Sequence, residues 1–596
     1  MQLSPPSPRR RRPSRAALLL RLLLVAALCL AFLTSTQERG AAPSSSSPAR
    51  ALLVVPRRGG LPLTTVRGRD DDGADAPPPH GLDAVLLPDW EVLLVLHPDQ
   101  DYDDGDAPPA PAGNNATATC VFPGGAASPA RPLGRMPTSG RRAYTCAMPE
   151  PERERRHNKK HLRAPKLVVT SEARSPPPPP QTASSRTAMH RWSGRLVYDA
   201  AAARDGSGDV LVFARGVNPR QGVNRDAADV RCVYYASIGE EEEEGVVASL
   251  PAITSAQQVF RCPRPPPTPA AGGHLRVTLA VAGDEEPIPS MATYSSSRRQ
   301  PSTTETTKQQ EEKKKARVCA CTMVRDVGKF LREWAVYHAA VGVDRFFLYD
   351  NGGGGGDDDL GAHVQRLRRD HSVSVSVSTL AWPWPKSQEA GFSHAAAAHV
   401  ESCEWMAFVD VDEFIFSPSW AGSPEPSKSM LRSLVAVGPD VGQITLGCRD
   451  FGPSGRTEHP REGVTQGYTC RRLHVERHKS LVRLGAVGRP LLNSVHHFEL
   501  RAGFRWERSS RAVVNHYKYQ AWAEFKAKFR RRVSTYVADW TQPVNPGSRD
   551  RTPGLGFQAV EPDGWPTRFC DVHDTSLRDA TRTWFGHAFT KVPTSR

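Results

Sequence analysis

The chain has 596 residues, a formal net charge of +15 and 39% hydrophobic residues. This length has room for about two or three domains, and the basic balance suits nucleic acid, a membrane surface or an acidic polymer as partner. No helix-turn-helix, zinc-finger or base-stacking strand signature accompanies the basic residues, so nucleic acid is not an expected partner. An acidic glycan or an anionic small molecule fits the charge better.

The first residues have the pattern of a membrane anchor. Arg9–Arg12 precede the apolar stretch Ala16–Leu33, which Arg21 alone interrupts. Basic residues before an apolar span of this length favour a cytosolic N-terminus. We therefore predict a basic tail, an uncleaved signal anchor and a disordered stem, at 1–15, 16–36 and 37–81. A cleaved signal peptide is the alternative.

Ten of the eleven cysteines follow the predicted anchor. That distribution fits an oxidising lumen, where the sequon Asn115-Ala116-Thr117 would carry a glycan. We expect a single-pass type II membrane protein of the secretory pathway. The expected location is the Golgi membrane, with the catalytic part in the lumen.

Residues 82–285 have the pattern of an all-β domain in two similar halves. Each half begins with an apolar strand and continues with a pair of cysteines; the strands are Trp90–Leu96 and Asp209–Phe213. This order predicts a duplicated β unit with one disulfide in each half, although spacing leaves other pairings open. The predicted disulfides are Cys120–Cys146 and Cys232–Cys262.

Two polar segments divide the chain further. The charged and then proline-rich stretch 150–185 predicts a disordered insert within the β domain. The stretch 286–316, rich in Ser, Thr, Gln, Glu and Lys, predicts a linker and the clearer domain boundary. The second domain would then occupy 317–596.

This second domain alternates between strand and helix patterns. Val318–Val324 has an apolar strand pattern, and Lys329–Val341 repeats apolar residues at helical spacing. The following strand, Phe346–Tyr349, leaves Asp350 at its carboxyl end. This β-α-β order predicts an α/β domain with a mostly parallel sheet and flanking helices.

Three further features belong to the same domain. Val373, Val375 and Val377 alternate with serine and predict a third strand, and Ser387–Cys403 has a helical pattern. Cys319-x-Cys321 lacks a second cysteine pair at zinc-finger spacing. These two cysteines are therefore expected in the core or in a disulfide, not at a metal.

The apolar run Trp405–Phe416 contains two acids one residue apart, Asp410 and Asp412. Its aromatic and β-branched residues predict a buried central strand that carries these acids to its carboxyl end, where open α/β sheets keep their ligands. Carboxylates are hard ligands for Mn²⁺ or Mg²⁺, which can bridge to the pyrophosphate of a sugar nucleotide. A solvated turn is the alternative, but unpaired carboxylates among apolar neighbours are costly.

Short motifs follow one another in a fixed order from Arg317 to Trp540. They are Cys321-Thr322-Met323-Val324, Phe330-Leu331-Arg332-Glu333-Trp334, Tyr349-Asp350-Asn351, Gln388-Glu389-Ala390-Gly391-Phe392-Ser393-His394, Phe408-Val409-Asp410-Val411-Asp412-Glu413-Phe414, Phe451-Gly452-Pro453-Ser454-Gly455, Arg477-His478-Lys479-Ser480, Asn493-Ser494-Val495-His496-His497-Phe498 and Asn515-His516-Tyr517-Lys518-Tyr519. This order resembles the plant branch of glycosyltransferase family 92. The anchor and the β domain resemble that family more weakly.

The resemblance implies a GT-A type fold and an inverting, metal-dependent transfer of a hexose from a nucleotide sugar. Known members transfer galactose from UDP-galactose, among them plant enzymes that extend pectic β-1,4-galactan. We therefore expect Mn²⁺ or Mg²⁺ as cofactor and a cell-wall or glycoprotein glycan as acceptor, with acidic pectin as one candidate. The chain departs from the family pattern at Asp326, where relatives usually have asparagine, and at Gly352–Gly356.

For the metal, three ligands are expected: Asp410, Asp412 and His496. Asp412 would touch the metal directly, whereas Asp410 would bind the donor ribose or a metal-bound water. An ordinary polar surface histidine is the alternative for His496. Glu413 is expected to support the site without binding the metal.

Further roles concern the donor and the acceptor. Asp350, at its strand end, and Asp326 are expected at the nucleotide, and Lys479 at the diphosphate, with a surface basic stretch as the alternative for Lys479. Inversion requires a base for the acceptor hydroxyl. Asp450 is the predicted base, with Glu499 as second choice.

Two rivals to a transferase remain: an inactive carbohydrate-binding or scaffold protein on a transferase fold, and a metal-dependent hydrolase. Two acids one residue apart along a strand are poorly placed for glycosidase work, where they must flank the bond. The predicted helix Ala521–Val537 has apolar residues on one face and basic residues elsewhere. A packing face with a solvated rim is the simpler interpretation, and a grip on an acidic pectic acceptor is the alternative.

Overall fold

The computed structural model describes residues 81–97, 117–154, 163–170, 181–183, 189–218, 223–238, 243–267, 274–295, 315–353, 359–369, 376–494, 496–528 and 561–586. The chain divides into two compact units, Met1–Ala76 and Pro77–Arg596, and the described residues all belong to the second. The predicted tail and anchor, nearly all of the stem, and Asn115 lie outside the described residues. Within the described ranges, no helix combines the length and apolar character needed to cross a bilayer.

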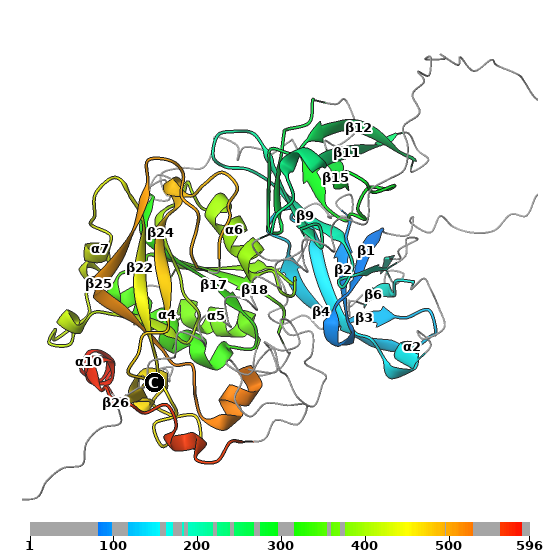
Figure 1. Cartoon of the computed structure of the whole chain (residues 1–596). Coiled ribbons are helices and arrows are strands. Elements are labelled where there is room, and N and C mark those ends of the chain that lie inside the picture. Colours follow the sequence, from blue (N-terminus) through cyan, green and yellow to red (C-terminus); the bar gives the residue numbers. More distant parts are fainter. Residues whose placement is uncertain are drawn as a thin grey trace, which may run out of the picture. The chain divides into compact units, whose positions relative to one another are not determined.

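An eight-stranded sheet forms the first part of the β region (Figure 1). In spatial order its strands are β7 (Gln181–Ala183), β6 (Lys166–Thr170), β3 (Thr117–Val121), β4 (Ala127–Arg135), β5 (Arg142–Ala147), β2 (Glu91–Leu96), β1 (Leu82–Leu86) and β8 (His190–Arg191). In β2, Val92 and Leu94 enter one hydrophobic core, and Leu93 and Val95 enter another. Burial on both faces explains why this strand is a continuous apolar run.

Two four-stranded sheets share a core in the second part of the β region. One contains β13 (Thr254–Ala256), β14 (Val259–Cys262), β10 (Val210–Arg215) and β9 (Leu196–Ala202). The other contains β12 (Glu243–Pro251), β11 (Val230–Ile238), β15 (His274–Val281) and β16 (Thr293–Ser295). Alternating residues of β10 pack toward the shared core, as expected for sheets stacked face to face.

The structure contains both predicted disulfides of the β region, but the two halves are built differently. Cys120–Cys146 joins β3 to β5 within one sheet, whereas Cys232–Cys262 joins β11 to β14 across two sheets. The structure therefore does not support a duplicated unit. The similar cysteine spacing arises because each bridge connects strands that are near neighbours along the chain.

The predicted boundaries of the β domain need correction. The stretch 150–185, predicted as a disordered insert, supplies a short helix α2 (Glu150–Glu154) and the strands β6 and β7. β6 pairs with β3 and buries Leu167, because the apolar residues 167–169 interrupt the polar sequence. At the other end, β16 pairs with β15 beyond the predicted limit of 285.

Asp199, in β9, is a buried carboxylate whose protonation is coupled to folding. Its Oδ1 accepts hydrogen bonds from the Ala200 N–H and the Thr138 hydroxyl, whereas its buried Oδ2 has no hydrogen-bond partner. Burial raises the pKa of Asp199 from 3.8 to about 7. Between these two values the folded chain binds a proton that the unfolded chain has released, so stability falls as pH rises through this range.

We expect Asp199→Asn to remove this pH dependence. The variant should gain up to about 4 kcal/mol over the wild type at pH 8 and little at pH 4, because the amide needs no proton to be neutral. Urea unfolding of both proteins across this range measures the difference, with the exposed Asp229→Asn as control. Equal pH profiles for wild type and Asp199→Asn would contradict the assignment.

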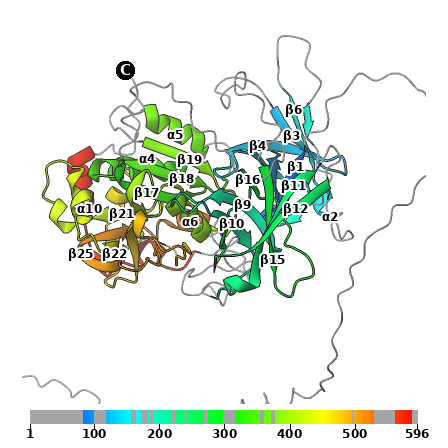
Figure 2. The ribbon, with the colours of Figure 1, turned by 90° about the horizontal axis from the view of Figure 1, so that it is seen from above.

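The C-terminal α/β domain contains a second eight-stranded sheet (Figures 1 and 2). In spatial order its strands are β19 (Ser376–Ala381), β18 (Arg345–Asp350), β17 (Ala316–Val324), β20 (Cys403–Phe408), β24 (Arg477–Arg483), β22 (Val441–Asp450), β25 (Arg505–His516) and β21 (Glu413–Phe416). The first four are parallel to one another, and β24 runs antiparallel to both its neighbours. The predicted β-α-β opening and parallel sheet are thus confirmed for this half of the sheet.

Helices cover both faces of this sheet. They are α4 (Gly328–Val341), α5 (Leu360–Arg369), α6 (Gln388–Ala398), α7 (Ser429–Leu434), α8 (Val464–Gly467) and α10 (Ser576–Phe585); a small two-stranded sheet pairs β23 (Cys470–Arg471) with β26 (Val572–His573). Val318 and Ala320 of β17 pack in one core with α4 and α5, and Cys319 and Cys321 pack in another with α6 (Figure 2). The period-two alternation along β17 therefore assigns each helix to a face.

Two further disulfides hold the α/β domain. Cys319–Cys403 links the adjacent parallel strands β17 and β20, so Cys319 is a bridge residue and the neighbouring Cys321 is a buried free thiol. Cys470–Cys570 ties β23 to the segment before β26. The expectation that the Cys-x-Cys pair belongs to the core or to a disulfide is correct for both residues.

Candidate functional site

Asp410 and Asp412 lie in a tight turn and not in a strand. β20 ends at Phe408 and β21 begins at Glu413, so the run predicted as one strand forms two. The Glu413 N–H donates to the Asp410 carbonyl, and the Glu413 carboxylate accepts from the Asp410 N–H, both at 3.0 Å. These bonds close a turn at the carboxyl end of β20 and redirect the chain to β21, on the far edge beside β25.

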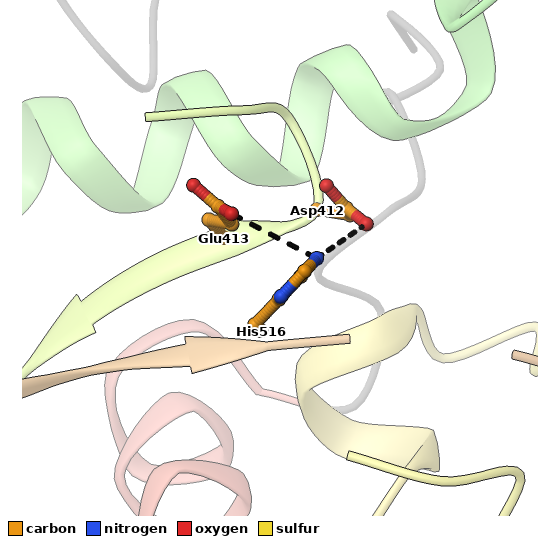
Figure 3. Close-up of side chains that lie close together, drawn as sticks. All are labelled: Asp412, Glu413 and His516. Carbon is orange, nitrogen blue, oxygen red and sulfur yellow. Dashed lines mark ion pairs between the residues drawn. The ribbon is translucent and has the colours of Figure 1, made fainter. Parts of the chain in front are cut away.

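Asp412, Glu413 and His516 form one buried group (Figure 3). His516 is the last residue of β25 and pairs with Glu413 across the β21–β25 ladder. Its Nε2 lies 3.4 Å from Asp412 Oδ2 and 3.7 Å from Glu413 Oε1. One ligand atom from each residue lies within 4.8 Å of the others. Two carboxylates and an imidazole are donors that suit Mn²⁺, so the group fits a divalent cation by its chemistry.

The electrostatics of this group favour positive charge. Burial alone would raise the pKa of Asp412, but the Lys528 ammonium and the His516 ring hold it well below its usual value. Burial alone would lower the pKa of His516, but the charges of Asp412 and Glu413 raise it. A proton on His516 therefore competes with a cation that needs the neutral imidazole.

Asp450, the predicted base, instead orients His516. It ends β22, is 1% exposed, and its Oδ1 accepts from His516 Nδ1 at 3.1 Å while Oδ2 accepts from Lys518 Nζ at 2.7 Å. Burial would raise the pKa of Asp450, but His516 and Lys518 hold it well below its usual range. Such a carboxylate is a poor base, but it fixes the ring so that Nε2 faces Asp412 and Glu413. These contacts are those of a residue that positions His516, and the role of Asp450 as the base stays a prediction.

Asp410, His496 and Lys479 form a second group next to the first. Lys479 Nζ lies 3.1 Å from Asp410 Oδ2 and 2.8 Å from Glu413 Oε1, and it donates to His496 Nε2. His496 Nδ1 donates to the Phe408 carbonyl at 2.8 Å, so both its ring nitrogens are engaged. Of the three predicted ligands, Asp412 is in the candidate cation group, whereas Asp410 and His496 surround a lysine.

A pocket with a volume of about 180 Å³ opens beside Asp412. This volume can hold several groups of the size of a water molecule. Its lining mixes apolar, amide and charged side chains, as small-molecule sites do. The lining residues are Met323, Val324, Arg325, Val327, Phe330, Asn351, Lys386, Ser387, Gln388, Asp410, Val411, Asp412, Gln520, Glu524 and Lys528. Several of them follow β17, β18 and β20, at the strand ends where open α/β sheets bind ligands.

Asp326 and Asp350, which are predicted at the nucleotide, are each next in sequence to a residue that lines the pocket. Asp350 ends β18 and accepts from the Gly352 N–H at 3.0 Å, and burial raises its pKa. Its neighbour Asn351 lines the pocket, and Asp326 has a positive φ of 48° next to the pocket residue Arg325. Arg325 and Asn351 therefore line the pocket at these strand ends, and the nucleotide roles of Asp326 and Asp350 stay predictions.

The β region supports one wall of this pocket. Trp192 donates from its ring N–H to the Pro385 carbonyl at 3.0 Å and stacks on Trp384. Gln258 donates to the carbonyl of Lys386, at 3.1 Å. Lys386 lines the pocket in a left-handed conformation, with φ of 57°. The β region thus holds the loop between β19 and α6 in place.

Sequence reasoning missed two residues of this site, His516 and Lys528. Asn515 and His516 follow an apolar run, Ala512-Val513-Val514, just as the acids follow the run of β20. That pattern marks a polar residue at a strand end and was available in the sequence. In the sequence, Lys528 lies among several basic residues of the predicted helix, and no local pattern separates it from them.

Comparison with known proteins identifies the family. The sequence profile of glycosyltransferase family 92 matches residues 314–546. A family 92 protein of Ricinus communis is 42% identical over 398 residues, which cover 65% of this chain and 66% of the relative. A family 92 protein of Oryza sativa subsp. japonica is 40% identical, covering 66% of each chain. One of Arabidopsis thaliana is 40% identical, covering 67% of this chain and 68% of the relative.

The chain therefore belongs to glycosyltransferase family 92. It spans 66%, just under two thirds, of the length of the Ricinus and Oryza relatives. Among solved structures, a mannosyltransferase of Pyrobaculum calidifontis in complex with GDP-Man and Mn²⁺ is 12% identical with a TM-score of 0.22, covering 40% of this chain and 67% of that one. A likeness this low carries no argument about fold or ligand.

Proposed function

We propose that the protein is an inverting, metal-dependent glycosyltransferase of GT-A type that moves a hexose from a nucleotide sugar to a glycan. One observation carries this proposal: the Asp412, Glu413 and His516 group lies beside a pocket at the carboxyl ends of parallel strands. The pocket offers Arg325, Asn351 and other polar groups to a nucleotide. Family membership agrees with this chemistry.

The chain's own residues prepare the site before any reaction. Asp450 holds the His516 ring, and Lys479 forms ion pairs with Asp410 and Glu413 that keep these side chains in place. A Mn²⁺ or Mg²⁺ ion held by Asp412 and His516, with Glu413 adjacent, would supply positive charge for the leaving diphosphate. The contacts of Trp192 and Gln258 hold the loop between β19 and α6, which lines another wall of the pocket.

Galactose from UDP-galactose is the donor we propose, because the motif resemblance implies it. On the same ground, the acceptor we propose is a cell-wall or glycoprotein glycan such as β-1,4-galactan. The basic and apolar pattern of residues 1–36 supports a type II orientation, which we propose for the Golgi membrane. Glycosylation at Asn115 would follow from that orientation.

The test offers the full chain a panel of UDP-sugars with Mn²⁺ and measures UDP release, with and without β-1,4-galacto-oligosaccharide. We expect release from UDP-galactose above the other donors, dependence on the cation, and stimulation by the acceptor. A folded protein that binds the oligosaccharide but neither hydrolyses a UDP-sugar nor binds Mn²⁺ would instead support the carbohydrate-binding alternative.

A further inference from the structure

Lys528 lies where the pocket meets the Asp412 group. It belongs to the helical residues 522–528, and its ammonium forms an ion pair with Asp412 Oδ2. Gln520, Glu524 and Lys528, four residues apart, all line the pocket. Gln520 precedes the helix, and Glu524 and Lys528, four residues apart within it, share one face. One face of this helix is therefore a wall of the pocket, with Lys528 at its Asp412 end.

The same oxygen of Asp412 serves two partners. Oδ2 accepts from Lys528 Nζ and lies 3.4 Å from His516 Nε2. A divalent cation held by Asp412 and His516 needs this carboxylate, and an ammonium has no lone pair with which to join the ligands. Two positive charges this close repel strongly where water is excluded. Lys528 and a divalent cation are therefore alternatives at Asp412.

Lys479, the other lysine near Asp412 and Glu413, is held more firmly than Lys528. Lys479 is held by Asp410, Glu413 and His496, and its side chain is 9% exposed. The Lys528 side chain is 24% exposed, and it forms an ion pair with Asp412. Its flexible stem allows the ammonium to turn from Asp412 into the pocket that it already lines, and an ammonium binds phosphate as a point charge.

We propose that the Lys528 side chain has two alternative positions. It pairs with Asp412 until a divalent cation binds there, and it then contacts the diphosphate of the nucleotide sugar. This rests on the proposed function, because it takes the pocket to be the donor site. It replaces Lys479 as the lysine for the diphosphate. It also makes cation binding precede tight donor binding, since the cation releases the lysine.

Lys528→Met tests the proposal because it predicts shifts of opposite sign. Without the competing ammonium, the dissociation constant for Mn²⁺ alone should fall by about fivefold or more. With Mn²⁺ saturating, the dissociation constant for UDP should rise by about the same factor, because the diphosphate loses a positive partner. Calorimetric titration of the full chain measures both. Lys528→Arg should restore UDP binding in part.

Lys526→Met is the matched control, since Lys526 lies on the same helix but outside the pocket lining, and it should change neither constant. Thermal unfolding confirms that the variants are folded. Unchanged or weaker Mn²⁺ binding in Lys528→Met, with a wild type that binds Mn²⁺ and UDP, overturns this inference alone. A wild type that binds neither ligand overturns the proposed function as well.

Discussion

Asp412→Ala is expected to abolish turnover while leaving the fold intact. The substitution removes the carboxylate that Lys528 and His516 share, and with it the cation that would neutralise the leaving diphosphate. We expect a loss of at least about a thousandfold in kcat. The fold should persist because the Asp412 carbonyl, which alanine retains, still accepts from the Tyr517 N–H at 2.9 Å.

Two controls sharpen this experiment. UDP release and Mn²⁺ binding are measured for Asp412→Ala alongside the exposed Asp563→Ala, which should behave as wild type. His516→Asn should lose Mn²⁺ binding, whereas His496→Asn should retain it, because only His516 belongs to the candidate cation group. Asparagine tolerates the positive φ of 72° at position 496. Wild-type kinetics in Asp412→Ala would refute the metal assignment.

Lys479→Met is expected to have the largest effect on stability. Burial alone would lower the pKa of Lys479, but Asp410 and Glu413 raise it, so it is charged in the fold. Its removal leaves Glu413, which is fully buried, without its compensating charge. Breaking a buried ion pair by removing one partner costs about 3–5 kcal/mol. Urea unfolding measures the loss.

A second substitution separates charge from packing. Lys479→Met combined with Glu413→Gln should be more stable than Lys479→Met alone, because the buried charge is gone and the glutamine carbonyl still accepts from the Asp410 N–H. The exposed Arg477→Met, on the same strand, should stay within about 0.5 kcal/mol of wild type. If the double variant is no more stable than the single one, the charge argument fails.

Local patterns were sufficient for much of the architecture. The helical spacing at 329–341 and the apolar strands on either side predicted α4 between β17 and β18, because amphipathic periods are set by the sequence alone. The disulfides Cys120–Cys146 and Cys232–Cys262 were predicted from cysteines close along the chain, a spacing that left other pairings open. The run Trp405–Phe416 was harder, because an apolar strand pattern does not show where a turn such as that at Asp410 interrupts it.

The sequence by itself determined the family and the order of elements in the α/β domain, and it indicated Asp412 as a candidate, because these depend on motifs and short-range periodicity. Only the tertiary structure decided that His516 and Lys528 meet Asp412, and that Asp450, Lys479 and His496 support the site. His516 and Lys528 lie more than a hundred residues from Asp412 along the chain, and the other three lie tens of residues away. Strand pairing brings His516, Asp450 and Lys479 to the site, and the segments around His496 and Lys528 pack beside it, which no local pattern encodes.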